Sequence, residues 1–380
     1  MQGYYRFPTI HKDKIAFVSD DDLWISDLNR LNAYRLTTNI SSVSTPKFSP
    51  DGKYIAYVGL EDGNTEVYII PSEGGVSKRV TFEGSYISKI CLWTDQGIIY
   101  ASDLYKPFSR ISDLRLFSII TNKSSGLNFG IASNIAINNS FTIIGRNTQE
   151  PARWKRYKGG TAGELWIDHN KNNFKKLIDI KGNLACPLII KNRIYFISDH
   201  EGIGNIYSCL KNGESLQKHT NHKNYYSRNA SCDTSKIIYH CGSRIFVYDT
   251  NNDNLKKINI KYNNSNVDTG RKFSYPGSYL SHSSLSNNAN YLNVITRGKS
   301  FILGCWDGPS IQYGKLNGVR YKHPIQFSKN KKLLLCSDEK NIEHFEIYNI
   351  ENSKLLKSYK KDLGRILEIK KSPITDIVCF

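Results

Sequence analysis

The chain alternates between short apolar strings and polar turns, and the apolar strings recur at a regular interval. Between residues 20 and 250 a β-rich string with one aromatic residue occurs six times: Leu23-Trp24-Ile25, Val67-Tyr68-Ile69, Leu116-Phe117-Ser118, Leu165-Trp166-Ile167, Ile206-Tyr207-Ser208 and Ile245-Phe246-Val247. Successive aromatic residues are 44, 49, 49, 41 and 39 positions apart. One four-stranded blade of a β-propeller consumes about 40 to 50 residues. The repeat therefore predicts an all-β protein that begins with a six-bladed β-propeller of four-stranded blades.

Polar turns precede these strings and support the same fold. The clearest turn is Ser49-Pro50-Asp51-Gly52-Lys53, which leads into an apolar strand. Asp-Gly between two apolar runs is a strong hairpin signal, because both turn residues then adopt positive φ. The equivalent turns of the other repeats are Gln96-Gly97, Asn139-Ser140, Lys191-Asn192 and Thr234-Ser235. An ordinary β-sandwich has a similar density of turns but would not repeat an aromatic residue at a fixed phase, so the pattern favours a propeller.

The character of the chain changes after residue 262, where a polar segment rich in asparagine begins. Residues 1–262 are predicted to form the six-bladed propeller and residues 263–272 a linker. Residues 273–380 are predicted to form the first two to three blades of an incomplete second propeller. Two repeat-like units lie around residues 291–303 and 332–348, and a third begins at residues 363–367. Two and a half blades cannot close a ring, so we expect an exposed sheet edge.

Composition adds constraints on partners and compartment. No stretch approaches the ~18 to 20 apolar residues of a membrane span, and the N-terminus has no signal-peptide core, so we expect a cytoplasmic protein without a membrane partner. Eight cysteines occur without a C-x-x-C pair, and this spacing favours free thiols over a zinc or redox site. The net charge is +18, spread along the chain. The pairs Lys175-Lys176, Lys256-Lys257 and Lys360-Lys361 follow aromatic strands, where lysine protects an outer edge from pairing.

Several strings resemble the tricorn protease family. The most specific is Ile144-Gly145-Arg146-Asn147-Thr148, followed by Trp154-Lys155-Arg156-Tyr157-Lys158-Gly159-Gly160-Thr161 and Gly163-Glu164-Leu165-Trp166-Ile167, which resembles the fourth blade of that family. Similar passages are Ile10-His11-Lys12-Asp13-Lys14-Ile15, Asp21-Asp22-Leu23-Trp24, Asp103-Leu104-Tyr105-Lys106-Pro107-Phe108-Ser109 and Arg193-Ile194-Tyr195-Phe196-Ile197-Ser198-Asp199. The resemblance covers essentially the whole chain.

The resemblance implies a six-bladed propeller followed by the start of a seven-bladed one. In that family the propellers are channels of a hexameric serine peptidase that trims oligopeptides, and the catalytic core and a PDZ domain lie far downstream. The resemblance therefore implies peptides as ligands, and a homo-oligomer or a separate catalytic chain as partner. The family's pair of adjacent arginines, which holds the carboxylate of the substrate, corresponds to residues 82–92. That segment contains no arginine here, so no residue role is carried over.

The sequence shows no catalytic centre of its own. It lacks the Gly-x-Ser-x-Gly string of a serine hydrolase. The adjacent Ser281 and His282 are expected to point to opposite faces of an extended strand. His219 and His222 have a spacing that suits a metal on a helix, but no third ligand is nearby in the sequence. Gly202-x-Gly204 lacks a third glycine and a following helix, and is read as a turn. We therefore expect no catalytic residue, metal or cofactor.

The segment from Arg153 to Gly163 is the best candidate for a functional surface. Its cations are Arg153, Lys155, Arg156 and Lys158, and they alternate with two aromatic residues before a Gly-Gly pair. Accessible backbone amides and guanidinium groups suit the capture of an anion or a peptide carboxylate. The segment could equally be structural, with its aromatic rings filling a gap between blades and its cations in water.

Three function classes follow. The first is a non-catalytic propeller module of tricorn type that acts as substrate channel and assembly platform in oligopeptide degradation. The second is a stand-alone propeller similar to TolB-like or WD40-like repeats, which binds protein partners. The third, nucleic-acid binding, would rest on charge alone, and no RNA or DNA module is recognisable, so nucleic acid is not an expected partner.

Overall fold

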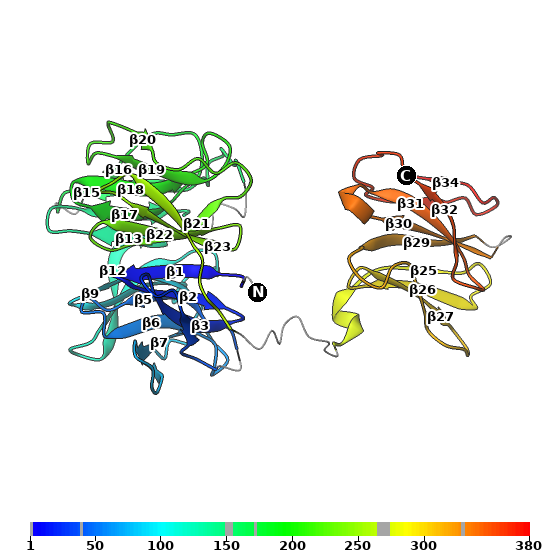
Figure 1. Ribbon diagram of the computed structural model, residues 1–380, viewed down its shortest axis with the longest axis horizontal. Coiled ribbons are helices and arrows are strands. Elements are labelled where there is room, and N and C mark those ends of the chain that lie inside the picture. Colours follow the sequence, from blue (N-terminus) through cyan, green and yellow to red (C-terminus); the bar gives the residue numbers. More distant parts are fainter. Residues whose placement is uncertain (1–2, 39–40, 149–154, 171–172, 264–273, 328–330) are drawn as a thin grey trace. The chain divides into compact units, whose positions relative to one another are not determined.

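The computed structural model describes residues 3–38, 41–148, 155–170, 173–263, 274–327 and 331–380. The chain divides into two compact units, Met1–Gly270 and Arg271–Phe380 (Figure 1). Both units consist of antiparallel sheets, which confirms the all-β prediction. The predicted linker, residues 263–272, falls outside the described residues except for Asn263. None of the helices within the described ranges is long and apolar enough to cross a membrane.

The first unit contains, in its described residues, six four-stranded sheets, each formed by four strands consecutive in the sequence. The strands of the first three sheets are β1 (Arg6–His11), β2 (Lys14–Ser19), β3 (Asp22–Asp27), β4 (Ala33–Arg35), β5 (Ser44–Phe48), β6 (Tyr54–Gly59), β7 (Glu66–Pro71), β8 (Lys78–Arg79), β9 (Ile87–Thr94), β10 (Gly97–Ser102), β11 (Asp113–Ser118) and β12 (Lys123–Ile131).

The strands of the other three sheets are β13 (Asn134–Ile137), β14 (Thr142–Arg146), β15 (Glu164–Asp168), β16 (Lys175–Lys176), β17 (Leu184–Ile190), β18 (Arg193–Ser198), β19 (Asn205–Cys209), β20 (Gln217–Lys218), β21 (Ser227–Cys232), β22 (Lys236–Cys241), β23 (Arg244–Asp249) and β24 (Asn254–Ile258). Each sheet is one blade of a propeller. Lys175-Lys176 and Lys256-Lys257 lie on the outermost strands β16 and β24, where edge protection was predicted.

The repeated aromatic residue lies on the third strand of every blade, at the third residue of the strand in five of them. Blade 3 departs from this register. There Arg115 is the third residue of β11, and Phe117 lies two residues further along. The prediction of one fixed phase is therefore wrong for Phe117. Side chains two residues apart point to the same face of a strand, so Phe117 is still buried between blades.

The Asp51-Gly52 turn also differs from the expected hairpin. Gly52 has φ +73°, but Asp51 is not among the residues with positive φ. The Asp51 carboxylate instead accepts hydrogen bonds from the Ser49 hydroxyl (2.6 Å) and the Lys53 amide (3.0 Å). Side-chain hydrogen bonds of this kind stabilise a longer turn in which only the glycine needs positive φ.

A buried polar pair recurs in three blades. The first residue of the third strand accepts a hydrogen bond from a threonine fifteen positions later, and the threonine oxygen accepts the next backbone N–H of the strand. The pairs are Asp22 with Thr37 (2.8 Å), Glu66 with Thr81 (2.5 Å) and Asn205 with Thr220 (2.9 Å). The threonine in each case satisfies a buried amide at the start of the strand.

The ring of blades closes between the first and the sixth blade without exchanging a strand. Backbone pairing beside β4 contributes to this closure: the Lys261 amide donates to the Leu31 carbonyl (2.7 Å), and the Ala33 amide donates to the Lys261 carbonyl (2.9 Å). The Tyr5 amide donates to the Ser243 carbonyl (3.2 Å), and the His240 Nδ1–H donates to the Tyr5 carbonyl (2.9 Å). One apolar cluster joins Tyr5 and Trp24 of the first blade region to Ile245 of the sixth. The closure therefore depends on a few specific contacts of residues far apart in the sequence.

Closure is expected to weaken in acid because His240 is buried as a neutral ring. Burial, with smaller effects of Arg228 and Arg6, lowers the pKa of His240 from 6.5 to about 4. As the pH falls, the His240 imidazole takes up a proton in the unfolded chain before it does so in the folded chain. The free energy of unfolding therefore decreases as the pH falls from about 6.5 to 4. The loss attributable to His240 should reach roughly 3 kcal/mol. Urea titrations of the wild type and of His240→Gln across this range measure it. The account of this histidine fails if the two pH profiles are parallel.

The second unit contains, in its described residues, two four-stranded sheets and one two-stranded sheet. Its strands and short 3-10 helices are η2 (Pro276–Tyr279), β25 (Leu280–Leu285), β26 (Tyr291–Thr296), β27 (Lys299–Gly304), β28 (Ile311–Tyr313), β29 (Tyr321–Phe327), β30 (Lys332–Ser337), η3 (Glu339–Asn341), β31 (His344–Asn349), β32 (Leu355–Tyr359), β33 (Lys370–Lys371) and β34 (Val378–Cys379). The two full sheets have the four-stranded, sequence-consecutive form of propeller blades, and their assignment to a second propeller stays a prediction.

The third repeat-like unit is less regular than the sequence suggested. Residues 363–367 form no strand, and pairing occurs only between β33 and β34. Ile366 and Ile369 are buried in an apolar cluster with Phe327, Leu334 and Phe345 of the preceding blade. The apolar residues of this segment therefore pack against the neighbouring sheet and do not form a strand. Lys360-Lys361 lie just beyond β32 rather than on it.

Candidate functional site

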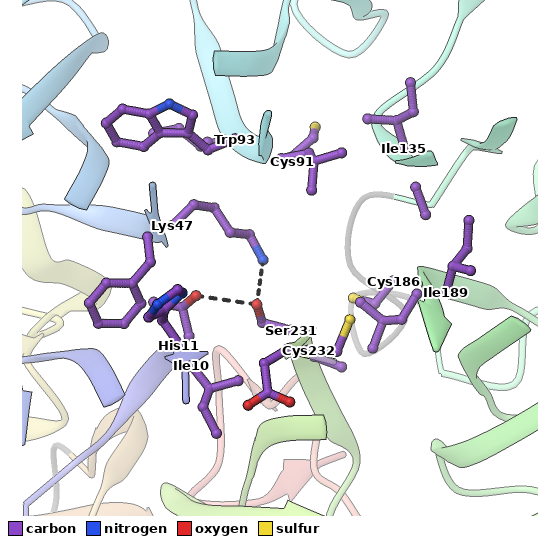
Figure 2. Close-up of a pocket in the computed structure, with 18 of the residues that line it drawn as sticks. Ile10, His11, Lys47, Cys91, Trp93, Ile135, Cys186, Ile189, Ser231 and Cys232 are labelled. Carbon is purple, nitrogen blue, oxygen red and sulfur yellow. Dashed lines mark hydrogen bonds between the residues drawn. The ribbon is translucent and has the colours of Figure 1, made fainter. Parts of the chain in front are cut away.

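A channel of about 770 Å³ runs among the inner strands of the first unit. It is lined by residues of β1, β5, β9, β13, β17 and β21, the first strand of each of the six blades. Figure 2 shows side chains from several of these strands projecting into the common space. The innermost strands of a propeller have one free edge, and these edges surround the axis. The channel is therefore the place where all six repeats meet.

Bulges shape the wall of the channel. Phe7, Thr45, Cys186 and Asn229 have φ between +47° and +51°, and each lies at a register shift of its inner strand. A bulge places an extra residue on one strand and re-aims the neighbouring side chains. Proline follows the first three of these residues, at Pro8, Pro46 and Pro187. Proline within a strand is confined to edges and bulges, so this was a sequence signal for the channel strands that our sequence analysis did not use.

Lys47 is the central cation of the channel. Its Nζ donates a hydrogen bond to Ser231 Oγ (2.9 Å; Figure 2). Ser231 Oγ lies 3.2 Å from Thr9 Oγ1. These three residues come from β5, β21 and β1. Enclosure by the channel walls lowers the pKa of Lys47 below its ordinary value near 10.5, and the charge of Lys89 acts in the same direction. Sequence analysis did not find Lys47, because a single lysine carries no pattern.

Three cysteines that form no disulfide also face this region. Cys91, Cys186 and Cys232 are partly buried residues of β9, β17 and β21 that line the channel. Burial raises the pKa of Cys91 and of Cys232 to about 11, so both are protonated at neutral pH. The Cys91 thiol donates to the Ser133 carbonyl (3.4 Å). The thiols of Cys91 and Cys232 therefore contribute no charge to balance Lys47.

Asp233, the acidic residue that follows Cys232, is engaged in a turn. Asp233 Oδ1 accepts hydrogen bonds from the backbone amides of Ser235 (2.8 Å) and Lys236 (2.7 Å). This carboxylate holds the turn between β21 and β22. The described lining of the channel thus has a positive interior and an acidic group that is committed to a turn.

The basic segment predicted from the sequence lies partly outside the described residues. Arg153 is not described. Lys155 Nζ lies 5.6 Å from the centre of the Tyr226 ring. The Arg156 backbone amide donates to Asp199 Oδ2 (2.8 Å), and its Nε donates to the Gly202 carbonyl (3.2 Å). Arg156 thus contacts a turn of the fifth blade and Lys155 a ring just before β21, and both residues are exposed, as is Lys158.

The histidines singled out in the sequence form separate hydrogen bonds. His219 Nε2 lies 2.7 Å from Ser208 Oγ, and its Nδ1 lies 2.8 Å from the Tyr248 hydroxyl. His222 Nε2 lies 2.8 Å from the Tyr239 hydroxyl. Burial lowers the pKa of both imidazoles. Both ring nitrogens of His219 and the Nε2 of His222 thus form hydrogen bonds with hydroxyl groups.

Ser281 and His282 do contact each other, contrary to the expectation of opposite faces. Ser281 Oγ lies 3.1 Å from His282 Nδ1, at a register shift of β25 between Leu280 and His282. The bulge changes the alternation of side chains at this point. Ser281 Oγ is also 3.3 Å from the Ile295 carbonyl, which can only accept a hydrogen bond. The Ser281 hydroxyl thus donates to the Ile295 carbonyl and can accept a hydrogen bond from the His282 Nδ1–H.

A buried cluster in the second unit contains metal-ligand residue types. The ligand atoms of Glu339, His344 and Glu346 lie within 4.8 Å of one another. His344 Nδ1 donates to the Ile342 carbonyl (2.9 Å), its Nε2 lies 3.2 Å from Glu346 Oε1, and Lys315 pairs with Glu339. Ion pairs and hydrogen bonds account for the charges of this cluster, which we interpret as structural.

The closed six-bladed ring and its lined channel define a β-propeller. The chain belongs to the tricorn protease family: residues 2–254 match the model of the tricorn protease N-terminal beta propeller domain. The chain is 36% identical over 384 residues to a tricorn protease homolog of Saccharolobus solfataricus, covering 98% of this chain and 35% of that protein. It is also similar to the crystal structure of the tricorn protease, with a TM-score of 0.76 and 27% identity over 98% of this chain and 37% of the other.

Two relatives are separate chains of one organism, Sulfurisphaera tokodaii. A putative tricorn-like protease N-terminal subunit is 38% identical over 176 residues, which cover 46% of this chain and 90% of that protein. A putative tricorn-like protease C-terminal subunit is 38% identical over 200 residues, which cover 53% of this chain and 23% of that protein. This chain spans about a third of the length of the Saccharolobus solfataricus homolog and of the tricorn protease in the crystal structure. The matches favour the tricorn-type interpretation over a TolB-like propeller.

Proposed function

We propose that this chain is the propeller portion of a tricorn-type serine peptidase, in which the six-bladed ring serves as a channel for oligopeptides. The observation that carries the proposal is the channel of about 770 Å³ lined by all six inner strands, in a chain that belongs to this family. Pockets of 300 to 1,000 Å³ are typical of small-ligand sites. An extended peptide segment fits a space of this size.

In this proposal the catalytic residues belong to other polypeptide than residues 1–380. The sequence has no Gly-x-Ser-x-Gly string. Relatives that exist as putative N-terminal and C-terminal subunits support a separate catalytic chain as partner. The two blades of the second unit add a platform for assembly with further polypeptide. A homo-oligomer and a cytoplasmic location stay predictions.

Peptide binding in the presence and absence of a channel block tests the proposal. Fluorescence anisotropy of labelled decapeptides is compared for the wild type, for Cys186→Trp, which narrows the channel, and for Cys305→Trp, an exposed control in the second unit. We expect Cys186→Trp to weaken binding at least tenfold and Cys305→Trp to leave it unchanged. Fluorogenic peptides should not be cleaved by the chain alone.

Replacement of Arg153, Lys155, Arg156 and Lys158 by serine tests the basic segment as a second, peptide- or anion-binding surface. Weaker binding of acidic peptides by this variant would support that surface, and unchanged affinity would exclude it. Peptide binding that is insensitive to Cys186→Trp would contradict the channel proposal. Turnover by the purified chain alone would contradict the assignment of catalysis to other polypeptide.

A further inference from the structure

We propose that Lys47, together with the hydroxyl groups of Ser231 and Thr9, forms a carboxylate-binding site inside the channel. This inference rests on the proposed function, since the ligand is a carboxylate of a peptide that enters the channel. The carboxylate belongs either to an acidic side chain or to the peptide C-terminus. The chemistry is the same for both sources.

Within the described residues, the Lys47 ammonium has N–H donors that meet no protein acceptor. A lysine ammonium has three N–H donors. One of them donates to Ser231 Oγ (2.9 Å), and this is the hydrogen bond that Lys47 forms with the described residues. A hydroxyl both donates and accepts, so the Ser231–Thr9 pair can pass one O–H donor on to a ligand. The site therefore offers ammonium and hydroxyl donors to an incoming oxygen atom.

The electrostatics of the site favour an anion. An ammonium enclosed without an opposite charge is costly, and the lowered pKa of Lys47 reflects that cost. Among the groups that act on it, Lys89 has the same sign, and burial raises the pKa of the Cys91 and Cys232 thiols to about 11, so both are protonated at neutral pH. His11 lines the same channel, and burial lowers the pKa of its imidazole, which favours the neutral ring. Asp233 is engaged in its turn. A carboxylate would supply the missing counter-charge through a charge-assisted hydrogen bond.

The walls around Lys47 suit a peptide better than a small inorganic anion. Trp93, Ile135 and Ile189 line the same space on other inner strands (Figure 2). Apolar walls with a few placed polar groups are typical of sites that take organic ligands. The channel can therefore accommodate apolar side chains of a peptide while Lys47 holds its carboxylate.

The test uses three labelled peptides of the same apolar sequence with acetylated N-termini. One ends in a carboxamide, one in a free carboxylate, and one has a central glutamate and a carboxamide end. Their Kd values are measured for the wild type, Lys47→Met, Ser231→Ala and Lys12→Met. Lys12→Met is the matched control, because it removes the same charge from an exposed residue at the channel rim.

We expect the wild type to bind at least one carboxylate peptide about tenfold more tightly than the carboxamide peptide. Lys47→Met should reduce this preference to within twofold, Ser231→Ala should reduce it about threefold, and Lys12→Met should retain it. The peptide that shows the preference identifies the source of the carboxylate. Equal binding of all three peptides to the wild type, or a preference retained in Lys47→Met, would overturn the proposal.

A pH series provides a second readout that needs no loss-of-function variant. The ammonium loses its proton as the pH rises through the pKa of Lys47, which lies below 10.5, so the preference should fade toward alkaline pH. Lys47→Arg, whose guanidinium stays charged, should keep the preference there. A wild-type preference that does not change with pH would contradict the role of Lys47. Binding that is insensitive to Cys186→Trp would instead indicate that the channel proposal itself has failed.

Discussion

Replacing Arg79 by methionine is expected to destabilise the six-bladed unit by about 3 to 5 kcal/mol. Arg79 Nη2 lies 3.0 Å from Glu66 Oε1, and the Glu66 side chain is 0% exposed. Glu66 also accepts hydrogen bonds from the Thr81 hydroxyl (2.5 Å) and the Gly84 amide (3.0 Å). Without the guanidinium, these two donors remain but the buried carboxylate has lost its opposite charge. Removing one partner of a buried ion pair is more damaging than replacing both.

Urea denaturation of a double-mutant cycle measures this effect. The variants are Arg79→Met, Glu66→Gln and the combination of both. Because glutamine removes the buried charge, Glu66→Gln should recover a substantial part of the stability lost in Arg79→Met. A loss below about 1 kcal/mol for Arg79→Met, the level of an exposed ion pair, would show that the pair contributes no more than a surface contact.

Replacing Tyr262 by alanine is expected to cost about 3 to 5 kcal/mol and to loosen the closure of the ring. The Tyr262 ring lies 4.5 Å from the Trp24 ring and 5.6 Å from the Tyr5 ring, measured between centroids. Its hydroxyl donates to Asp20 Oδ2 (2.6 Å) and lies 2.9 Å from Ser19 Oγ. The substitution removes both the packed ring and these hydrogen bonds. Tyr262→Phe, which removes only the hydroxyl, should cost about 1 to 3 kcal/mol.

Hydrogen exchange shows where the ring opens. Amides of β1–β4 and β21–β24 should exchange faster in Tyr262→Ala than in the wild type, whereas amides of β9–β12 should change little. Tyr105→Ala is the control, because that side chain is 90% exposed. A uniform increase in exchange over all six blades would contradict the role of Tyr262 in closure, as would a free-energy change below about 1 kcal/mol.

The repeat made the fold predictable because each blade has to bury the same faces. The aromatic strings and the turns located the third strands and the hairpins of the six-bladed unit. The errors follow from the period of two in a strand. Phe117 moved by two residues without changing face, and a search for one fixed phase does not detect such a shift. The apolar residues of the segment 363–367 pack against the preceding blade without forming a strand. Apolar content alone does not distinguish a strand from a packed loop.

The candidate site was much less predictable. A cluster of cations such as Lys155, Arg156 and Lys158 is visible in a sequence, but Lys155 and Arg156 contact residues of later blades or of the segment between them. Lys47, Ser231 and Thr9 are separated by up to 222 positions and meet because the ring closes. The sequence did carry one signal of the channel strands, since Pro8, Pro46 and Pro187 mark edge or bulge positions. It could not show which side chains face the axis, because the bulges alter the alternation.

Photo-crosslinking of a bound peptide tests the central claim most directly. A decapeptide with a photoreactive apolar residue is irradiated with the purified chain, and the adducts are mapped by mass spectrometry. The account predicts adducts on β1, β5, β9, β13, β17 and β21, and their loss in Cys186→Trp. Adducts confined to outer strands or to the second unit would contradict a peptide channel in the six-bladed ring.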